Sequence, residues 1–211
     1  MKNSQTYSEI KYNLDENKYS VSKIDGQYVT QGPLNVGFQI TRRCNLKCVY
    51  CSESKQLPEM TLREIERAFI NLKNAGVLKV NITGGEPFLR KDFREIISLG
   101  KYLGFYLTVG SNATLVDRKT AEYLSDKLVY FESTLDGSPE LHNKVRGDYD
   151  KVIDGMKKIS EAMIPQHIAM VLLGKTIEDA KHVVKTAHEL KAQHVKFLVP
   201  IYKGRGKFLS Q

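Results

Sequence analysis

From residue 35 onward, short runs of apolar and β-branched residues alternate with segments in which apolar residues recur every three or four positions. The short runs are typical of strands and the longer segments of amphipathic helices, and their alternation indicates repeated βα units around a parallel sheet. Because most of the runs are largely apolar, we expect helices to cover the outer face of the sheet. The six predicted strands are Val36–Thr41, Leu78–Thr83, Phe105–Val109, Leu128–Leu135, His167–Leu173 and His194–Pro200.

The helix predicted between the first two strands has the clearest boundaries. Thr61 and Glu64 have the spacing of a capping box, and Gly76 is positioned to end the helix. The residues predicted to form its apolar packing stripe are Leu62, Ile65, Phe69 and Leu72. Further helices are predicted at about 92–103, 116–125, 149–162 and 177–190. The predicted fold class is therefore α/β, a partial (βα)6 TIM-like barrel.

Length and composition indicate one core with an appendage. The chain has 211 residues, of which 41% are hydrophobic, enough for one substantial core. We predict a barrel core over residues 35–211 and an N-terminal extension over residues 1–34. Within the extension, residues 19–30 alternate weakly around Asp25-Gly26, which suggests a β-hairpin.

The net charge and the pattern of apolar residues limit the classes of partner that we expect for this protein. The net charge is +8, but Lys and Arg are scattered, so a solvated basic surface is the preferred interpretation. No nucleic-acid-binding module accompanies the charge, and a nucleic-acid partner is not expected. The sequence contains neither an export signal nor 18 consecutive apolar residues, so we expect a cytoplasmic protein that does not bind a membrane.

The three cysteines of the chain, Cys44, Cys48 and Cys51, follow the first predicted strand as Cys-x3-Cys-x2-Cys. An odd, tightly clustered set argues against a disulfide framework and favours metal binding. Three thiolates can hold three corners of a cubane iron–sulfur cluster and leave one iron open, or they can bind zinc with a fourth ligand from elsewhere. None of the five histidines is near the loop in sequence, which makes zinc the lesser alternative.

A second motif, Thr83-Gly84-Gly85-Glu86-Pro87, follows the second predicted strand. Paired glycines let a backbone approach a ligand closely, although a tight turn before a helix explains them equally well. Functional residues of such folds lie in loops at the carboxyl ends of strands. The cysteine loop and this motif are therefore expected on the same rim of the sheet.

Together the two motifs closely resemble those of the radical S-adenosylmethionine (radical SAM) enzymes, over residues 35 to about 206. In that family the three cysteines bind a 4Fe-4S cluster, whose free iron is chelated by the amino and carboxylate groups of S-adenosyl-L-methionine. The resemblance implies this metal-binding role for Cys44, Cys48 and Cys51. It implies that Gly84, Gly85, Glu86 and Pro87 contact the methionine amino group of the cofactor. Tyr50 matches the position that packs beside the adenine, with a loop-anchoring role as the alternative.

Later segments resemble the branch of the family that matures peptides and peptide-derived cofactors. Thr134-Leu-Asp-Gly137, Leu141-His142 and Val145-Arg146-Gly147 carry this likeness. It implies that Thr134 and Arg146 hold the ribose or carboxylate of the cofactor, the alternatives being a strand-end threonine and a surface salt bridge. For Asp136 and His142 we prefer a structural role.

Two further stretches depart from the pattern of the family. Ser111-Asn112-Ala113-Thr-Leu resembles its Thr-Asn-Gly-Thr-Leu stretch, which implies a cofactor or substrate contact for Asn112, but alanine replaces glycine and puts the turn geometry in question. Lys203-Gly-Arg-Gly206 resembles its Pro-x-Gly-Arg stretch, with a flexible basic tail as the alternative.

The resemblance implies that one electron enters the cluster, that S-adenosyl-L-methionine is cleaved, and that a 5′-deoxyadenosyl radical abstracts hydrogen from a substrate, a reaction sensitive to oxygen. We predict a peptide or peptide-derived substrate and an electron donor such as flavodoxin or ferredoxin. The alternatives are a nucleotide or other small-molecule precursor and a non-catalytic iron–sulfur or zinc scaffold. No titratable pair is assigned a catalytic role.

Enzymes of this branch usually carry a cysteine-rich C-terminal extension, and no cysteine follows Cys51. We therefore expect a truncated chain, the alternative being a short member with one cluster and an open barrel side that a substrate or partner covers. We also expect exposed apolar surface near the sixth predicted strand.

Overall fold

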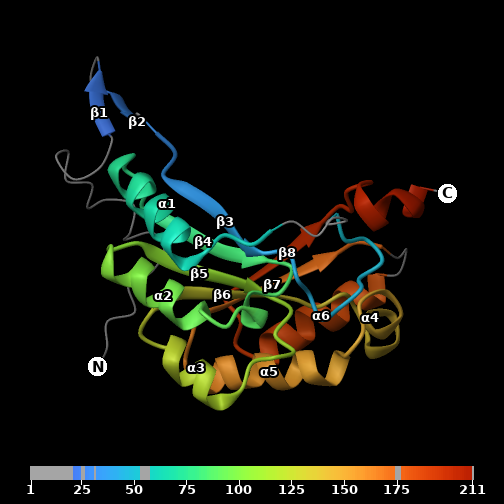
Figure 1. The fold of residues 1–211 in the computed structure, drawn as a ribbon. Coiled ribbons are helices and arrows are strands. Elements are labelled where there is room, and N and C mark those ends of the chain that lie inside the picture. The colour runs from blue at the N-terminus through green and yellow to red at the C-terminus, as the bar shows by residue number, and fades with distance from the viewer. Residues whose placement is uncertain (1–20, 25–26, 31, 53–57, 174–176, 211) are drawn as a thin grey trace.

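The protein is described by a computed structural model, which covers residues 21–24, 27–30, 32–52, 58–173 and 177–210. Its centre is a six-stranded sheet in which all neighbouring strands are parallel and follow one another in chain order (Figure 1). The six predicted strands are confirmed, with ends shifted by one or two residues. They are β3 (Asn35–Thr41), β4 (Lys79–Gly84), β5 (Tyr106–Ser111), β6 (Leu128–Thr134), β7 (Gln166–Val171) and β8 (His194–Leu198).

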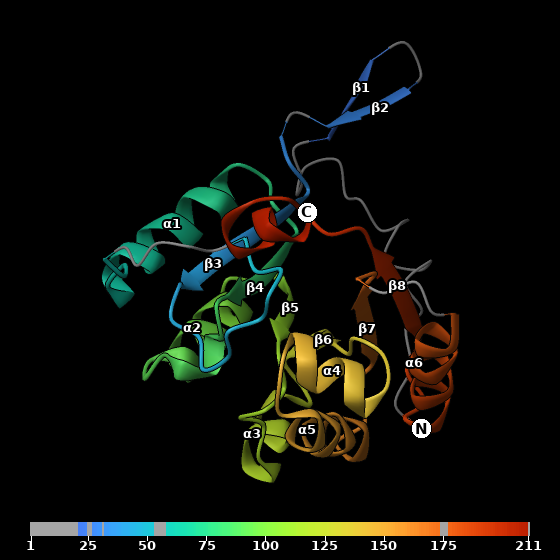
Figure 2. The ribbon, with the colours of Figure 1, turned by 90° about the vertical axis from the view of Figure 1, so that its right-hand side faces the viewer.

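Five predicted helices alternate with these strands and lie along the convex side of the curved sheet (Figures 1 and 2). They are α1 (Leu62–Asn74), α2 (Phe93–Tyr102), α3 (Arg118–Leu124), α5 (Tyr149–Glu161) and α6 (Ile177–Glu189). A sixth helix, α4 (Pro139–Val145), and two 3-10 helices, η2 (Pro87–Leu89) and η3 (Gly204–Ser210), were not predicted. The sheet stays open between β3 and β8, so the architecture is the expected partial barrel.

Helix α1 shows why the start and the buried face of a helix could be predicted from the sequence. The Thr61 hydroxyl accepts a hydrogen bond from the backbone N–H of Glu64, and the Glu64 carboxylate accepts one from the backbone N–H of Thr61 at 2.7 Å. This is the predicted capping box. Ile65 and Phe69 are completely buried against the sheet, whereas Leu62, in the first turn, is 37% exposed and lies outside the packing stripe.

The two faces of the sheet differ in chemistry. The convex face presents the apolar core beneath the helices, with Ile82, Val109 and Phe131 fully buried. Along β4 and β5 the alternate positions carry polar side chains, among them Asn81 and Thr108, whose hydroxyl donates to the Asn81 amide oxygen at 3.0 Å. Because side chains alternate along a strand, the concave face is polar while the convex face is apolar.

The N-terminal part described by the structure is a two-stranded antiparallel ribbon, β1 (Val21–Ile24) and β2 (Gln27–Thr30), which projects from the sheet in Figure 1. The predicted turn Asp25-Gly26 lies outside the described residues, as do residues 1–20. The boundary at residue 34 stays a prediction. Among the described residues no helix is long and apolar enough to cross a membrane.

Candidate active site

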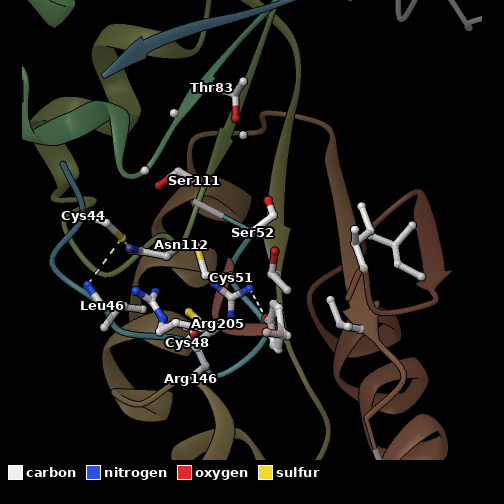
Figure 3. Close-up of a pocket in the computed structure, with 18 of the residues that line it drawn as sticks. Cys44, Leu46, Cys48, Cys51, Ser52, Thr83, Ser111, Asn112, Arg146 and Arg205 are labelled. Carbon is white, nitrogen blue, oxygen red and sulfur yellow. Dashed lines mark hydrogen bonds between the residues drawn. The ribbon is translucent and has the colours of Figure 1, made fainter. Parts of the chain in front are cut away.

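A cavity of about 370 Å³ lies at the carboxyl ends of the strands (Figure 3). Residues from the cysteine loop, from β3 to β8 and from the segment after β8 line it. Figure 2 looks onto this end of the sheet, where η3 lies in front of β3. The predicted site residues that line the cavity are Cys44, Cys48, Tyr50, Cys51, Gly84, Gly85, Asn112, Thr134 and Arg146. Glu86 and Pro87 do not line it.

The cysteine loop leaves β3 and is held by its own backbone and by α4. The Cys51 N–H donates to the Cys48 carbonyl at 3.2 Å, and the Val49 N–H donates to the Val145 carbonyl at 2.9 Å. Cys48 is buried, whereas Cys44 is exposed as a residue although its thiol is half-buried. Burial raises the pKa of the Cys44 and Cys48 thiols, while the Arg146 guanidinium opposes that rise. The positive charge of Arg146 therefore acts on the thiols, and Arg146 lines the same cavity.

These thiols fit an iron–sulfur cluster by the chemistry of the donor set. A cubane takes one thiolate at each of three irons, so its ligands need not converge on one point. Within the described parts of the chain, no three metal-ligating side chains do converge in that way. All three thiols instead border one cavity, which Gly84, Gly85 and Thr134 also line. Cys44, Cys48 and Cys51 would hold such a cluster at the edge of this cavity.

The paired glycines serve close packing between two loops. A Cβ on Gly84 would lie 2.4 Å from the Thr41 carbonyl oxygen, and one on Gly85 would lie 2.3 Å from the Arg43 carbonyl oxygen. The Gly85 N–H donates to the Thr41 carbonyl at 2.9 Å, and the Glu86 N–H to the Arg43 carbonyl at 2.7 Å. The turn after β4 is thus bound to the start of the cysteine loop. Because Gly84 and Gly85 have no side chains, it is their backbone that lines the cavity.

Glu86 stays a predicted cofactor contact, and its carboxylate makes several hydrogen bonds inside the protein. Its carboxylate is fully buried and accepts hydrogen bonds from the Ser111 hydroxyl at 2.9 and 3.0 Å, from the Asn112 N–H at 2.8 Å and from the Phe88 N–H at 3.1 Å. Burial raises its pKa, which these hydrogen bonds oppose. With its oxygens engaged inside the protein, Glu86 ties the turn after β4 to the end of β5. Pro87 is buried as the first residue of η2.

Asn112 connects the end of β5 to the cysteine loop. Its Nδ2 donates to the Asn45 Oδ1 at 2.9 Å and lies 3.9 Å from the Cys44 Sγ. Figure 3 shows the Asn112 side chain beside Cys44. Its Oδ1 accepts from the Thr114 N–H at 2.9 Å. The next residue, Ala113, has a φ of 63°, so the alanine adopts the left-handed conformation that favours glycine. The turn is therefore kept despite the substitution.

Tyr50, Asp136 and Arg146 form a buried network beside the cavity. The Tyr50 hydroxyl bonds to the Asp136 carboxylate and the Arg146 guanidinium, and Arg146 Nε lies 3.0 Å from Asp136 Oδ2. Burial raises the pKa of Tyr50. Burial opposes the charge on Arg146, but Tyr50 and Asp136 outweigh it and raise its pKa. The salt bridge of Arg146 is thus not on the surface. The Tyr50 hydroxyl anchors the cysteine loop, and Tyr50 also lines the cavity.

Asp136 and His142 have the structural role that was preferred for them. Both are fully buried, and His142 Nδ1 accepts a hydrogen bond from the Asp136 N–H at 3.0 Å. Asp136 Oδ1 also accepts from the Val171 N–H at 2.8 Å, which ties β6 to β7. Burial lowers the pKa of His142 to about 4. The imidazole is therefore neutral, with Nδ1 as its acceptor.

Arg205 is a site residue that the sequence reasoning did not select. It lines the cavity from η3, so the Lys203–Gly206 stretch is part of the site and not a flexible tail. The resemblance of Lys203–Gly206 to a family motif was the available signal. A short basic stretch with two glycines does not by itself show which loop it will contact. Leu198, Val199, Pro200 and Ile201 also line the cavity and were not predicted as site residues.

Comparisons with known proteins agree with this geometry. The family model of the radical SAM superfamily matches residues 38–187, and the chain belongs to that family. Its members bind an iron–sulfur cluster of the 4Fe-4S type and S-adenosyl-L-methionine.

Three proteins illustrate the range of its relatives. The chain is 30% identical over 179 residues to an Fe-coproporphyrin III synthase of Methanosarcina barkeri, covering 81% of this chain and 45% of that protein. It is 26% identical over 181 residues to a PqqA peptide cyclase of Bradyrhizobium diazoefficiens, covering 82% and 48%. Streptococcus suis SuiB bound to precursor peptide SuiA has the same fold, with a TM-score of 0.75 and 23% identity over 82% of this chain and 41% of SuiB. The chain therefore spans less than half the length of each of these proteins.

Proposed function

We propose that this chain is the radical-generating core of an enzyme that modifies a peptide. The observation that carries the peptide assignment is the position of the cavity against the last strand of the described sheet. Leu198, Val199 and Ile201 line the cavity and are 43%, 76% and 66% exposed. The expected apolar surface near this strand is therefore present.

An extended peptide fits this edge for a general physical reason. Within the described sheet β8 pairs only with β7, so its outer backbone groups face away from the sheet. A strand edge can bind an extended peptide through main-chain hydrogen bonds, while neighbouring pockets select side chains. The exposed apolar residues after β8 supply contact area directly beside the cavity. The peptide-modifying relatives support the same assignment.

In this proposal each part of the site has a defined task. Cys44, Cys48 and Cys51 hold the cluster, and the backbone of Gly84 and Gly85 faces the methionine part of the cofactor. Asn112, Thr134 and Arg146 border the remainder of the cavity. Glu86 keeps the glycine turn in place through its buried carboxylate.

When bound, the cluster and S-adenosyl-L-methionine supply reductive cleavage and hydrogen abstraction from the substrate. The protein contributes positioning and exclusion of water, since the radical chemistry belongs to the cofactors. The buried Tyr50–Asp136–Arg146 network fixes one wall of the cavity, and the segment after β8 covers another.

A small-molecule substrate is the second candidate. The relation to the Fe-coproporphyrin III synthase, at 30% identity over 81% of the chain, supports it. The two proposals differ in whether the substrate needs the exposed segment after β8.

The first experiment is anaerobic cluster reconstitution, followed by chromatography for 5′-deoxyadenosine after addition of dithionite and S-adenosyl-L-methionine. Cys48→Ala is expected to abolish the product. Lys47→Ala, an exposed position in the same loop, is expected to retain it. Product formation by Cys48→Ala with a complete cluster would overturn the ligand assignment. No product from wild type with a formed cluster would refute the view that this chain alone is a competent radical core.

The peptide assignment is tested separately by binding. A library of fluorescent synthetic peptides is screened by anisotropy against wild type, Val199→Asp and Val184→Asp. Both positions carry exposed valines, but Val184 lies on α6. We expect peptide binding that Val199→Asp abolishes and Val184→Asp preserves. Binding of a tetrapyrrole instead of any peptide would favour the second candidate.

A further inference from the structure

The side-chain amide of Asn112 has one orientation that its neighbours allow. Its Oδ1 accepts hydrogen bonds from the Thr114 N–H at 2.9 Å and from the Thr114 hydroxyl at 2.6 Å. A backbone N–H can only donate, so the oxygen of the Asn112 amide has to face Thr114. The nitrogen of the same amide therefore faces the cysteine loop.

Asn45, which follows Cys44 in the cysteine loop, completes a ring of hydrogen bonds with these two residues. Asn112 Nδ2 donates to Asn45 Oδ1 at 2.9 Å, and Asn45 Nδ2 donates to the Thr114 hydroxyl at 2.8 Å. Each of the three side chains thus donates to the next. Reversing either amide would place two donors against each other, so the ring has one consistent orientation.

The ring leaves one N–H of Asn112 for the sulfur of Cys44. A side-chain amide has two N–H groups, and the bond to Asn45 uses one of them. Asn112 Nδ2 also donates to Cys44 Sγ at 3.9 Å, a long hydrogen bond to the larger sulfur atom. The Leu46 N–H donates to the same sulfur at 3.4 Å, and Figure 3 shows both donors beside Cys44. The Cys44 sulfur therefore accepts from one backbone donor and one side-chain donor.

Asn112 is fixed in this position by its backbone as well as by its side chain. The residue is only 4% exposed, and its N–H donates to the buried Glu86 carboxylate at 2.8 Å. The next residue, Ala113, is completely buried. A donor that is already held in place stabilises charge on its acceptor without a cost of reorganisation.

A hydrogen bond to a cysteine sulfur has a defined effect on an iron–sulfur cluster. The reduction potential of such a cluster depends on hydrogen bonds to its sulfur atoms, on its net charge and on its exposure to solvent. Uptake of one electron makes the cluster and its thiolates more negative, and an N–H donor bonds more strongly to a more negative acceptor. A donor to a ligand sulfur therefore favours the reduced form and raises the reduction potential.

We propose that Asn112 is a positioning residue that raises the reduction potential of the cluster through its N–H bond to the Cys44 thiolate. It thereby favours uptake of the one electron that an external donor supplies. This role differs from the contact with S-adenosyl-L-methionine or substrate that the family resemblance implies for Asn112. The inference rests on Cys44 as a cluster ligand in the proposed function, but it does not depend on the identity of the substrate.

The test is an anaerobic redox titration of the reconstituted full chain, without S-adenosyl-L-methionine or substrate. Dithionite supplies one electron per cluster, electron paramagnetic resonance measures the reduced form, and iron and sulfide per chain are measured for each protein. We expect Asn112→Leu to shift the midpoint potential to a more negative value. The expected loss is roughly two- to tenfold in the ratio of reduced to oxidised cluster at a fixed potential, and tenfold corresponds to about 59 mV for one electron.

Asn81→Leu is the matched control. Asn81 is also an asparagine on the concave face whose amide oxygen accepts a hydrogen bond, from the Thr108 hydroxyl at 3.0 Å, but it does not line the cavity. We expect Asn81→Leu to keep the wild-type potential. Asn112→Ala is measured alongside in case Asn112→Leu does not fold or does not take up the cluster. It removes the same N–H without adding apolar bulk, and we expect a smaller shift in the same direction.

Three results would overturn this role of Asn112: an unchanged potential in both Asn112 variants with a full cluster, an equal shift in Asn81→Leu, or a shift to a higher potential. Weaker binding of S-adenosyl-L-methionine with an unchanged potential would instead give Asn112 the cofactor contact that the resemblance implies. A wild-type chain that forms no cluster would count against the ligand assignment of the proposed function. A full cluster with unchanged potentials would count against Asn112 alone, so the two failures are distinguishable.

Discussion

Arg205 Nε donates a hydrogen bond to the carbonyl oxygen of Cys48 at 2.8 Å, although the two residues are 157 positions apart in the chain. The Arg205 N–H also donates to the Cys51 carbonyl at 2.9 Å. Gly204, with a φ of 59°, brings η3 so close that a Cβ there would lie 2.5 Å from the Ser52 carbonyl oxygen. The segment after the last strand therefore holds the loop that carries the three thiols.

Arg205→Met is expected to loosen the cysteine loop while its fold is retained. Loss of a charged donor to a partly buried carbonyl costs roughly 1.5–3 kcal/mol of local stability. We expect less iron per chain after reconstitution and faster loss of iron to a chelator. Arg118→Met, at a surface pair with Glu161, is the control and should behave as wild type. Equal iron retention in both variants would show that η3 does not position the loop.

Glu86→Gln separates a positioning role from a direct contact with the cofactor. The amide keeps the size of the side chain but replaces one acceptor oxygen by a donor, which disrupts its bonds to the Ser111 hydroxyl or the Asn112 N–H. We expect the free energy of unfolding to fall by about 1–3 kcal/mol. Urea unfolding of the metal-free chain measures it. Weaker binding of S-adenosyl-L-methionine with unchanged unfolding would instead indicate that Glu86 contacts the cofactor.

The alternation of strands and helices was predictable because each strand has one face in a continuous apolar core. Val80, Ile82, Leu107 and Val109 show this directly, since all are fully buried beneath the helices. Helix α4 was missed because its seven residues are too short to show a period. Its Ser138 N-cap and Pro139 are nonetheless local start signals.

The parts of the site that could not be predicted depend on contacts between distant segments. The buried carboxylate of Glu86 has partners 25 and 26 positions away, at Ser111 and Asn112. Arg205 reaches Cys48 across almost the whole barrel sequence. The motif suggested a ligand contact for Glu86, and only the packing of β4 against β5 shows where its carboxylate lies.

Ala113→Gly tests the turn in which alanine replaces the glycine of the family pattern. Relief of the left-handed alanine gains roughly 1–2 kcal/mol, whereas the added backbone entropy of glycine costs roughly 0.5–1 and the lost buried methyl about 0.8. We expect a nearly unchanged free energy of unfolding. The matched control Ala121→Gly lies within α3 and is equally buried, so it loses helix propensity and a buried methyl, about 2 kcal/mol together. Equal destabilisation of both variants would show that Ala113 is not strained.

The buried histidine His142 makes the fold sensitive to acid. Its folded-state pKa of about 4 lies below the ordinary value of 6.5, so the unfolded chain binds its proton first as the pH falls. Stability is therefore independent of this group above about pH 6.5 and is lost as the pH falls toward 4. One pKa unit corresponds to about 1.4 kcal/mol, which sets an upper limit of about 2 kcal/mol on the stability lost through His142 between pH 6.5 and 5.

Urea unfolding of the metal-free chain at a series of pH values measures the slope of the free energy of unfolding against pH. His142→Asn should reduce this slope, whereas His188→Asn, at an exposed position of α6, should keep the wild-type slope. Burial also lowers the pKa of His167 to about 4, so part of the slope is expected to remain in His142→Asn. A slope equal to that of wild type would mean that His142 does not contribute to it.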